Sequence, residues 1–291
     1  MNNSEITENA YAKINLTLEV IKKRADGYHD ISSVMQTVDL HDLVKVQNSE
    51  TLELSMNGGI EASYNLAFKA GQLLQKVTGT KHGAKIFLYK NIPISAGLGG
   101  GSSNAAATLR ALNKLWELRL TNKELAEIGA SLGSDVPFLV YGGTALVMGK
   151  GDDVQRLVSP AIDRVLILCP RIHLPFKTRS MFNSISDDLF TKGNLTHKLA
   201  ARIRARKDCP SSLFFNVFSD VAGSTFSTWS GYKDVFMGMG ARDITLSGAG
   251  PGMFTVPPTK EIGTAWHLLL SKTKGWQSFL TTRFNPPDRT D

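Results

Sequence analysis

Cysteine is nearly absent from this sequence: only Cys169 and Cys209 occur among its 291 residues. Two thiols cannot build a disulfide framework or a zinc site made of cysteines alone, so reduced thiols are expected. No run approaches the roughly 18 apolar residues of a membrane span, and residues 165–169 are at most a buried strand. Residues 1–9 are polar and carry no secretory or organellar signal pattern, which favours a cytoplasmic protein.

Several catalytic motifs are missing as well. The sequence contains no Gly-x-x-x-x-Gly-Lys-Ser/Thr loop and no dinucleotide-binding fingerprint. It lacks the His-Arg-Asp and Asp-Phe-Gly motifs, which excludes a protein kinase. The six histidines are scattered without ligand spacing, so neither a Ser-His-Asp triad nor a zinc protease is indicated.

Acidic residues are outnumbered, at 26 against 33 basic residues, which gives a net charge of +7. The densest basic stretch is 198–207. Leu199 and Ile203 share one face of that stretch, so it is predicted to be a surface helix with a solvated basic side. No aromatic residue interleaves with these charges, so binding to nucleic acid is not expected.

Strands and helices are mixed along the chain. Residues 12–20 alternate strictly, with Ile14 and Leu16 on one face and Lys13 and Asn15 on the other, which predicts a strand. Further strands are expected at 52–56, 85–90 and 165–169, with two short ones flanking 248–252. Helical spacing occurs at 66–77, 105–116 and 125–132, the last opened by a capping box at 121–124. The pattern predicts an α+β protein with domains at 1–155 and 156–291.

A glycine-rich loop, PISAGLGGGSSNA at 93–105, is the strongest local signal. It follows a predicted strand and runs directly into a predicted helix. Glycines let backbone N–H groups approach an anion closely, and a helix N-terminus adds unpaired donors and a positive dipole end. Ser102 and Ser103 add hydroxyls where phosphate oxygens or a metal ion would lie. The loop is therefore predicted to bind phosphate.

Two other segments are ambiguous from their residues alone. Asp135, in GSDVPF, stands at the start of a helix that Pro137 favours, so it is either a helix cap or a functional carboxylate. The stretch SGAGPG at 247–252 is either a structural turn between two strands or part of a site.

Taken together, these segments resemble the GHMP small-molecule kinases. The resemblance rests on AKINL at 12–16, RADGYH at 24–29, the loop at 93–105, GSDVPF at 133–138 and SGAGPG at 247–252. It is close over residues 10–150 and looser beyond them. Within the family, Asp26-Gly27-Tyr28-His29 indicates a member whose alcohol substrate carries a cytidine diphosphate group.

The resemblance implies a two-domain fold with the active site in the cleft between the domains. It implies transfer of the γ-phosphoryl group of ATP, with Mg²⁺, to the 2-hydroxyl of a cytidine diphosphate-linked alcohol, in the non-mevalonate route to isoprenoid precursors. Asp135 would be the general base and Lys13 would stabilise charge. The groups that hold Mg²⁺ are left open, with Ser102, Ser103 and Asp135 as candidates.

The remaining site residues are also carried over from the resemblance. Tyr28 and Phe182 would sandwich the cytosine ring and His29 would read its polar edge. Asn15 would hold the substrate near Asp135 and Lys13, and Thr178 would line the acceptor pocket. The nucleotide would be bound by Asn65, Lys90, Pro93, Gly97, Leu98, Gly99, Gly100, Gly101, Ser102 and Ser103.

Two alternatives stay open. One is another GHMP kinase, of the homoserine or mevalonate type, whose small aliphatic substrate has no ring to stack between aromatic side chains. The other is a non-catalytic nucleotide-binding sensor of the same fold, which should have lost the base or the lysine. The expected partners are ATP and a small-molecule substrate, with no nucleic acid or membrane, and the chain is expected to be a monomer or a homodimer.

Overall fold

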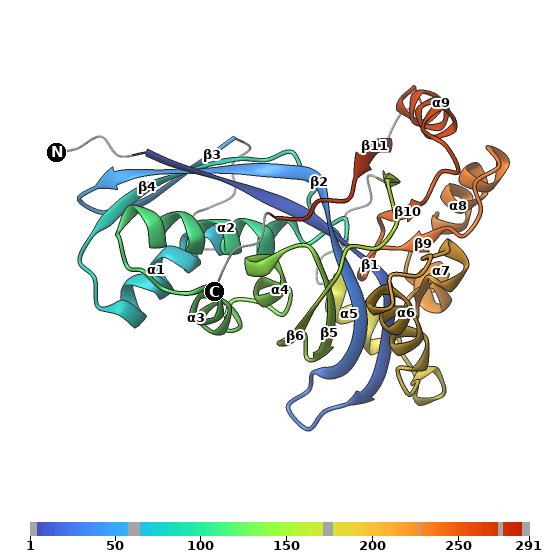
Figure 1. Ribbon diagram of the computed structural model, residues 1–291, viewed down its shortest axis with the longest axis horizontal. Helices are drawn as coiled ribbons and strands as arrows, with labels where there is room; N and C mark the ends of the chain where they lie inside the picture. The colour runs from blue at the N-terminus through green and yellow to red at the C-terminus, as the bar shows by residue number, and fades with distance from the viewer. Residues whose placement is uncertain (1–4, 58–64, 171–176, 227, 273–275, 287–291) are drawn as a thin grey trace.

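The computed structural model describes residues 5–57, 65–170, 177–226, 228–272 and 276–286 (Figure 1). The first half of the chain forms β1 (Glu5–Lys23), β2 (His29–Ser49), β3 (Leu52–Met56), α1 (Leu66–Thr78), β4 (Gly83–Tyr89), α2 (Gly100–Leu115), α3 (Asn122–Gly129), α4 (Val136–Tyr141), β5 (Thr144–Gly149) and β6 (Asp153–Leu157). Among the described residues no helix is long and apolar enough to cross a membrane.

The second half forms shorter elements. They are β7 (Arg164–Pro170), α5 (Lys177–Asn183), α6 (Asn194–Arg204), β8 (Phe215–Asn216), α7 (Ser219–Thr225), α8 (Trp229–Gly238), β9 (Thr245–Leu246), β10 (Met253–Thr255), α9 (Lys260–Ser271) and β11 (Trp276–Thr282). Two 3-10 helices, Asp187–Leu189 and Ser211–Leu213, lie between them.

Two sheets organise the molecule. The larger has the order β3-β4-β2-β1-β8, with β5 also paired to β2 and β6 paired to β5. The smaller has the order β11-β7-β10-β9. Figure 1 shows α1 to α4 beside the larger sheet and α7 to α9 around the smaller one. The prediction of an α+β protein is therefore confirmed.

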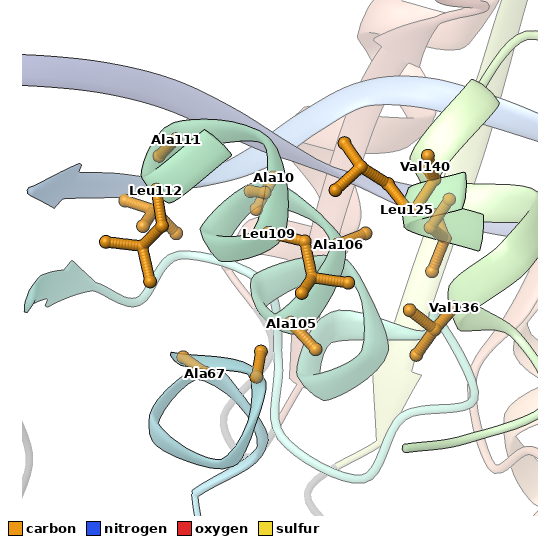
Figure 2. Close-up of a cluster of buried hydrophobic side chains, with 14 of the residues drawn as sticks. Ala10, Ala67, Ala105, Ala106, Leu109, Ala111, Leu112, Leu125, Val136 and Val140 are labelled. Atoms are coloured by element: carbon orange, nitrogen blue, oxygen red, sulfur yellow. The ribbon is translucent and has the colours of Figure 1, made fainter. Parts of the chain in front are cut away.

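Strand β1 connects the hydrophobic clusters of the two halves. Ala10 packs in the cluster formed with α1 to α4, Ile14 in a central cluster, and Val20 in the cluster around the smaller sheet. The first cluster is shown in Figure 2, where leucines and alanines of α2 face α1, α3 and α4. Pairing of β1 with β2 shifts register between Asn15 and Thr17. Such irregularities bend and twist a strand, which lets β1 follow both halves.

Most of the predicted elements occur close to their expected bounds. The capping box of α3 is present, with Glu124 N donating to Thr121 Oγ1 at 3.2 Å and Thr121 N donating to Glu124 Oε2 at 2.8 Å. That helix ends at Gly129, however, before the predicted Leu132. Strand β1 is longer than predicted because it pairs with β2 from Glu5 to Lys23. The predicted domain boundary after residue 155 falls inside β6, and the smaller sheet begins with β7 at Arg164.

Candidate active site

A cleft of about 1160 Å³ is lined by residues from both halves of the chain. Its walls come from β1, the glycine-rich loop, the start of α4, α5 and the loop between β9 and β10. All of the predicted site residues line this cleft except Ser103. The structure therefore gathers into one place residues that are as distant in sequence as Lys13 and Phe182.

Asp135 and Lys13 face each other in the cleft. Lys13 Nζ lies 3.5 Å from Asp135 Oδ2, with the lysine side chain 4% exposed and the aspartate side chain 28% exposed. Asp135 precedes α4 at the N-cap position, yet among the described residues it makes no side-chain capping hydrogen bond. The carboxylate is thus directed to Lys13 and the cleft, which argues against a role as a helix cap alone.

Hydrogen bonds fix the position of the Lys13 ammonium. Lys13 Nζ donates to Asn15 Oδ1 at 2.7 Å, and Asn15 Nδ2 donates to Ser33 Oγ at 2.8 Å. Gly248 N also donates to Asn15 Oδ1, at 3.0 Å. The alternation of β1 placed Lys13 and Asn15 on one face, but it did not show that this face is buried beneath two glycine-containing loops.

The loop at 93–105 meets the turn at 247–252. Gly97 has φ +82°, and a Cβ there would lie 2.0 Å from the carbonyl oxygen of Ser247. Ser247 Oγ donates to the Gly97 carbonyl at 3.1 Å, and Gly252 N donates to the Ala96 carbonyl at 3.0 Å. Only glycine fits this approach, so the second turn is part of the site as well as a connection between strands.

Helix α2 begins at the glycine loop and its N-terminus opens into the cleft. Gly99 is its N-cap and supplies no side-chain cap, and Gly100, Gly101 and Ser102 all line the cleft. The first N–H groups of a helix lack intrahelical acceptors and carry its positive dipole end. This geometry suits the oxygens of a phosphate chain.

Ser103 departs from the predicted phosphate contact. Its hydroxyl donates to the carbonyl oxygen of Tyr11 at 2.7 Å, and the residue is only 2% exposed. Ser103 is one residue beyond Ser102 on α2, so its side chain points towards β1 and away from the cleft. Ser103 therefore anchors the helix to the sheet, while Ser102 remains at the cleft.

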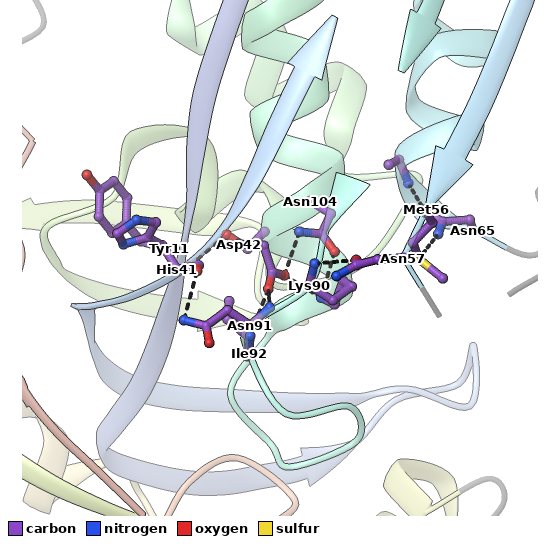
Figure 3. Close-up of polar contacts among 12 residues, drawn as sticks. Tyr11, His41, Asp42, Met56, Asn57, Asn65, Lys90, Asn91, Ile92 and Asn104 are labelled. Atoms are coloured by element: carbon purple, nitrogen blue, oxygen red, sulfur yellow. Dashed lines mark hydrogen bonds and ion pairs between the residues drawn. The ribbon is translucent and has the colours of Figure 1, made fainter. Parts of the chain in front are cut away.

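Lys90 belongs to a buried polar network that the sequence did not reveal (Figure 3). Its ammonium pairs with Asp42, which is fully buried, and donates to Asn104 Oδ1 at 2.9 Å. Asp42 Oδ1 also accepts from the backbone N–H groups of Asn91 and Ile92, at 2.6 and 2.7 Å. A Cβ on Gly100 would lie 3.3 Å from Lys90 Nζ, so this cation lies against the glycine loop.

Asn65 has a local structural role in addition to its place in the cleft. It is the N-cap of α1, and its Oδ1 accepts from Ala67 N at 2.9 Å. Asn is among the preferred N-cap residues because its side chain satisfies a free N–H of the first turn. Its amide also donates to Met56 Sδ at 3.6 Å.

The aromatic residues Tyr28, His29 and Phe182 all line the cleft. Phe182 stacks on His29, with ring centroids 5.0 Å apart and planes at 20°. Tyr28 is 57% exposed, and Lys150 Nζ lies 6.0 Å from its ring centroid. Burial and the nearby Lys23 lower the pKa of His29, which favours the neutral imidazole. A planar ring entering the cleft would meet the His29–Phe182 pair on one side.

Lys177 is a cleft residue that sequence reasoning missed. Its ammonium donates to the carbonyl oxygens of Ser95, at 2.6 Å, and of Gly250, so it joins the two loops. Burial and the positive charge of Lys13 lower its pKa to about 8. Two described acceptors use two of the three N–H donors of an ammonium, so one remains for a ligand. A lone lysine beside Thr178 gives no sequence signal of this position.

Metal ligands in the cleft are sparse. The described residues contain no group of three or more His, Cys, Asp or Glu side chains that could hold a metal ion. Mg²⁺ commonly binds through one or two carboxylates, water and substrate phosphates. The Asp135 carboxylate and the Ser102 hydroxyl, which both line the cleft, fit that kind of site.

Comparisons with known proteins agree with this geometry. Residues 65–143 match the family described as GHMP kinases N terminal domain. The 4-diphosphocytidyl-2-C-methyl-D-erythritol kinase of Dehalococcoides mccartyi (strain CBDB1) is 38% identical over 282 residues, covering 96% of this chain and 98% of the relative. The enzyme of the same name from Geobacillus sp. (strain WCH70) is 39% identical, covering 84% and 86%.

Solved structures show the same fold. A 4-(cytidine 5'-diphospho)-2C-methyl-D-erythritol kinase has a TM-score of 0.81 at 25% identity, covering 97% of this chain and 100% of that one. The homoserine kinase from Cytophaga hutchinsonii has a TM-score of 0.74 at 18% identity, covering 98% and 97%. At 18% identity, the similarity to the homoserine kinase shows a shared fold only.

Proposed function

This chain belongs to the GHMP kinases and, within them, to the 4-diphosphocytidyl-2-C-methyl-D-erythritol kinases, and on that premise we propose that it transfers the γ-phosphoryl group of ATP to the 2-hydroxyl of that alcohol. The reaction is a step of the non-mevalonate route to isoprenoid precursors. The observation that carries the proposal is the pairing of Lys13 and Asp135 beside the N-terminus of α2.

Asp135 is the general base of this proposal. A base beside the acceptor hydroxyl is needed because that oxygen loses its proton as it attacks phosphorus. The carboxylate is partly exposed to the cleft and is not used by α4. Lys13 offsets the negative charge that develops between the acceptor and the phosphoryl group, and Asn15 holds the ammonium in place.

The phosphates of ATP are assigned to the loop between Gly97 and Ser102. Phosphoryl transfer passes through a loose transition state, so positioning and charge stabilisation supply most of the catalysis. Mg²⁺, when bound, would neutralise phosphate charge, and it would be held by Ser102, the phosphate oxygens and, through water, Asp135. Lys90 lies beside Gly100, where it can support the nucleotide.

Substitution of Lys177 by methionine tests whether its ammonium contacts phosphate. At pH 7 the variant is expected to lose about tenfold in kcat/KM for ATP, the size of one charge-assisted contact. Because the pKa of Lys177 is about 8, the wild-type value should fall as the pH rises through 8 and the lysine loses its charge. A pH profile of kcat/KM should show this limb in the wild type and in Lys192→Met, an exposed control, but not in Lys177→Met. Identical limbs in all three proteins would contradict the contact.

A panel of alcohol substrates tests the function itself. ADP release from ATP and Mg²⁺ should occur with 4-diphosphocytidyl-2-C-methyl-D-erythritol and not with homoserine or mevalonate. The cytosine ring would pack against the His29–Phe182 pair, for which the aliphatic alcohols have no equivalent group. Turnover with another alcohol would contradict the cytosine contacts, and ATP binding without any turnover would favour a sensor.

Location and assembly follow from the proposed reaction only as expectations. A biosynthetic kinase that uses ATP and a nucleotide-linked metabolite is expected in the cytoplasm. The site is built from residues of one chain, so a monomer would be sufficient for activity and a homodimer is equally compatible.

A further inference from the structure

A second cavity, of about 680 Å³, lies apart from the cleft. It is lined by the residues that follow α4, by strand β6 with the loop after it, by the end of α6, and by the segment that follows β11. Within the described part of the chain, no residue lines both this cavity and the cleft. Its volume is within the range of small-molecule sites, which is roughly 300–1,000 Å³.

Four cationic side chains line this second cavity: Arg156, Arg206, Lys207 and Arg283. None of its described lining residues is acidic. Arg206 and Lys207 follow the C-terminus of α6, where cations complement the helix dipole. That explanation does not extend to Arg283 after β11. Arg206, Lys207 and Arg283 bring positive charge from two separate segments to one cavity, and an anion would relieve their mutual repulsion.

The same cavity also has an apolar side. Leu157, Val158, Pro160, Ile203 and Pro286 are among its lining residues. Inorganic phosphate would use the cations and leave this surface unmatched. A small molecule that joins a phosphate to an apolar group would contact both, because apolar burial adds to the charge-assisted hydrogen bonds.

Helix α4 connects this cavity with the general base. Asp135 stands at its N-cap in the cleft, and Gly142 and Gly143 follow its last turn and line the second cavity. The cavity end of α4 is held in place: Gly143 N donates to Thr37 Oγ1 at 2.9 Å, and Thr37 Oγ1 donates to the Phe284 carbonyl at 2.8 Å. Gly143 and Asp135 thus lie at opposite ends of one helix of six residues, which connects the cavity with the cleft.

We propose that this cavity is a regulatory site that binds a small phosphorylated molecule with an apolar group. The phosphate is held by Arg206, Lys207 and Arg283, and the apolar group lies against Leu157 and Ile203. Occupancy lowers kcat by displacing α4. The regulatory half of this proposal rests on the proposed function, because it requires Asp135 to be the base, whereas the binding half does not.

Binding is tested by calorimetry with saturating ADP in the cleft and phenyl phosphate as the probe. The wild type is expected to bind it with a Kd of about 1 mM or lower, and more tightly than inorganic phosphate. Arg206→Gln with Lys207→Gln should weaken binding about tenfold. The matched control, Lys192→Gln with Lys198→Gln, removes two exposed charges near α6 that do not line the cavity, and should leave binding unchanged. No binding, no preference for phenyl phosphate, or equal loss in both double variants would overturn the site.

Regulation has a separate readout. At saturating ATP and alcohol substrate, phenyl phosphate should lower kcat of the wild type by at least about twofold, because small displacements of a catalytic group are costly. The Arg206→Gln, Lys207→Gln variant should show the same kcat with and without the probe. An effect on KM alone would indicate competition in the cleft, and binding with unchanged kcat would contradict the regulatory half. Because calorimetry needs no turnover, an inactive enzyme would leave the binding result intact.

Discussion

Asp135→Asn is expected to lower kcat by about 10²–10⁴-fold, the usual contribution of a general base. Asparagine keeps the size of the side chain and removes its capacity to accept the proton of the attacking hydroxyl. The fold should be retained, since the Asp135 carboxylate makes no described capping bond to α4. Steady-state ADP release and the dissociation constant of ATP, measured on the same preparation, should show a large loss of kcat with nearly unchanged ATP binding.

Asp153→Asn is the matched control for that substitution. Asp153 is exposed at the start of β6 and does not line the cleft, so its kcat should equal that of the wild type. If Asp135→Asn retained more than about a tenth of wild-type kcat, the residue would be a positioning group and the base would have to be found elsewhere.

Lys13→Met is expected to lower kcat by about 10²–10³-fold, the typical loss when one preorganised donor to developing charge is removed. Methionine preserves most of the aliphatic stem of the lysine side chain. That stem packs against Gly99, since a Cβ on Gly99 would lie 2.9 Å from Lys13 Cγ. The change therefore removes mainly the ammonium that lies 3.5 Å from Asp135. Lys123→Met, on the exposed side of α3, provides a control of equal charge change.

A double-mutant cycle separates cooperation from independent roles. If Lys13 and Asp135 act as one unit, the double variant should be about as slow as Asp135→Asn alone, because groups that act together have non-additive effects on kcat. Losses that multiply would show that Lys13 acts on the phosphates independently of the base, and would refute the paired mechanism.

Much of the fold could be predicted because local patterns decide local structure. The alternation around Ile14 and the capping box at Thr121 both led to elements that the structure contains. The end of α3 could not be placed, because Leu132 continues the apolar spacing although the helix stops at Gly129. Periodicity describes which face is apolar, whereas the end of a helix depends on where the chain must turn.

The sequence predicted which residues line the cleft better than it predicted where their side chains point. The loop residues and Lys13 line the cleft, but Ser103 points away from it because successive helical residues are rotated by about 100°. The burial of Asp42 could have been predicted from the sequence, since Asp42 falls on the same alternating face of β2 as Val44 and Val46. An acidic residue on such a face requires buried partners. The position of Lys177 could not be predicted in this way, because its partners Ser95 and Gly250 are remote in sequence.

The contacts between the two glycine-containing turns also set the order in which activity can appear during protein synthesis. Asn15 accepts from Gly248 N, Gly97 from Ser247 Oγ, and Ala96 from Gly252 N. Chains fold from the N-terminus as they leave the ribosome, so β1 and the phosphate loop emerge long before those partners. A nascent chain that ends before Gly252 lacks the support for Lys13 and for the loop. We therefore expect the active site to be complete only when nearly all of the sequence has been translated.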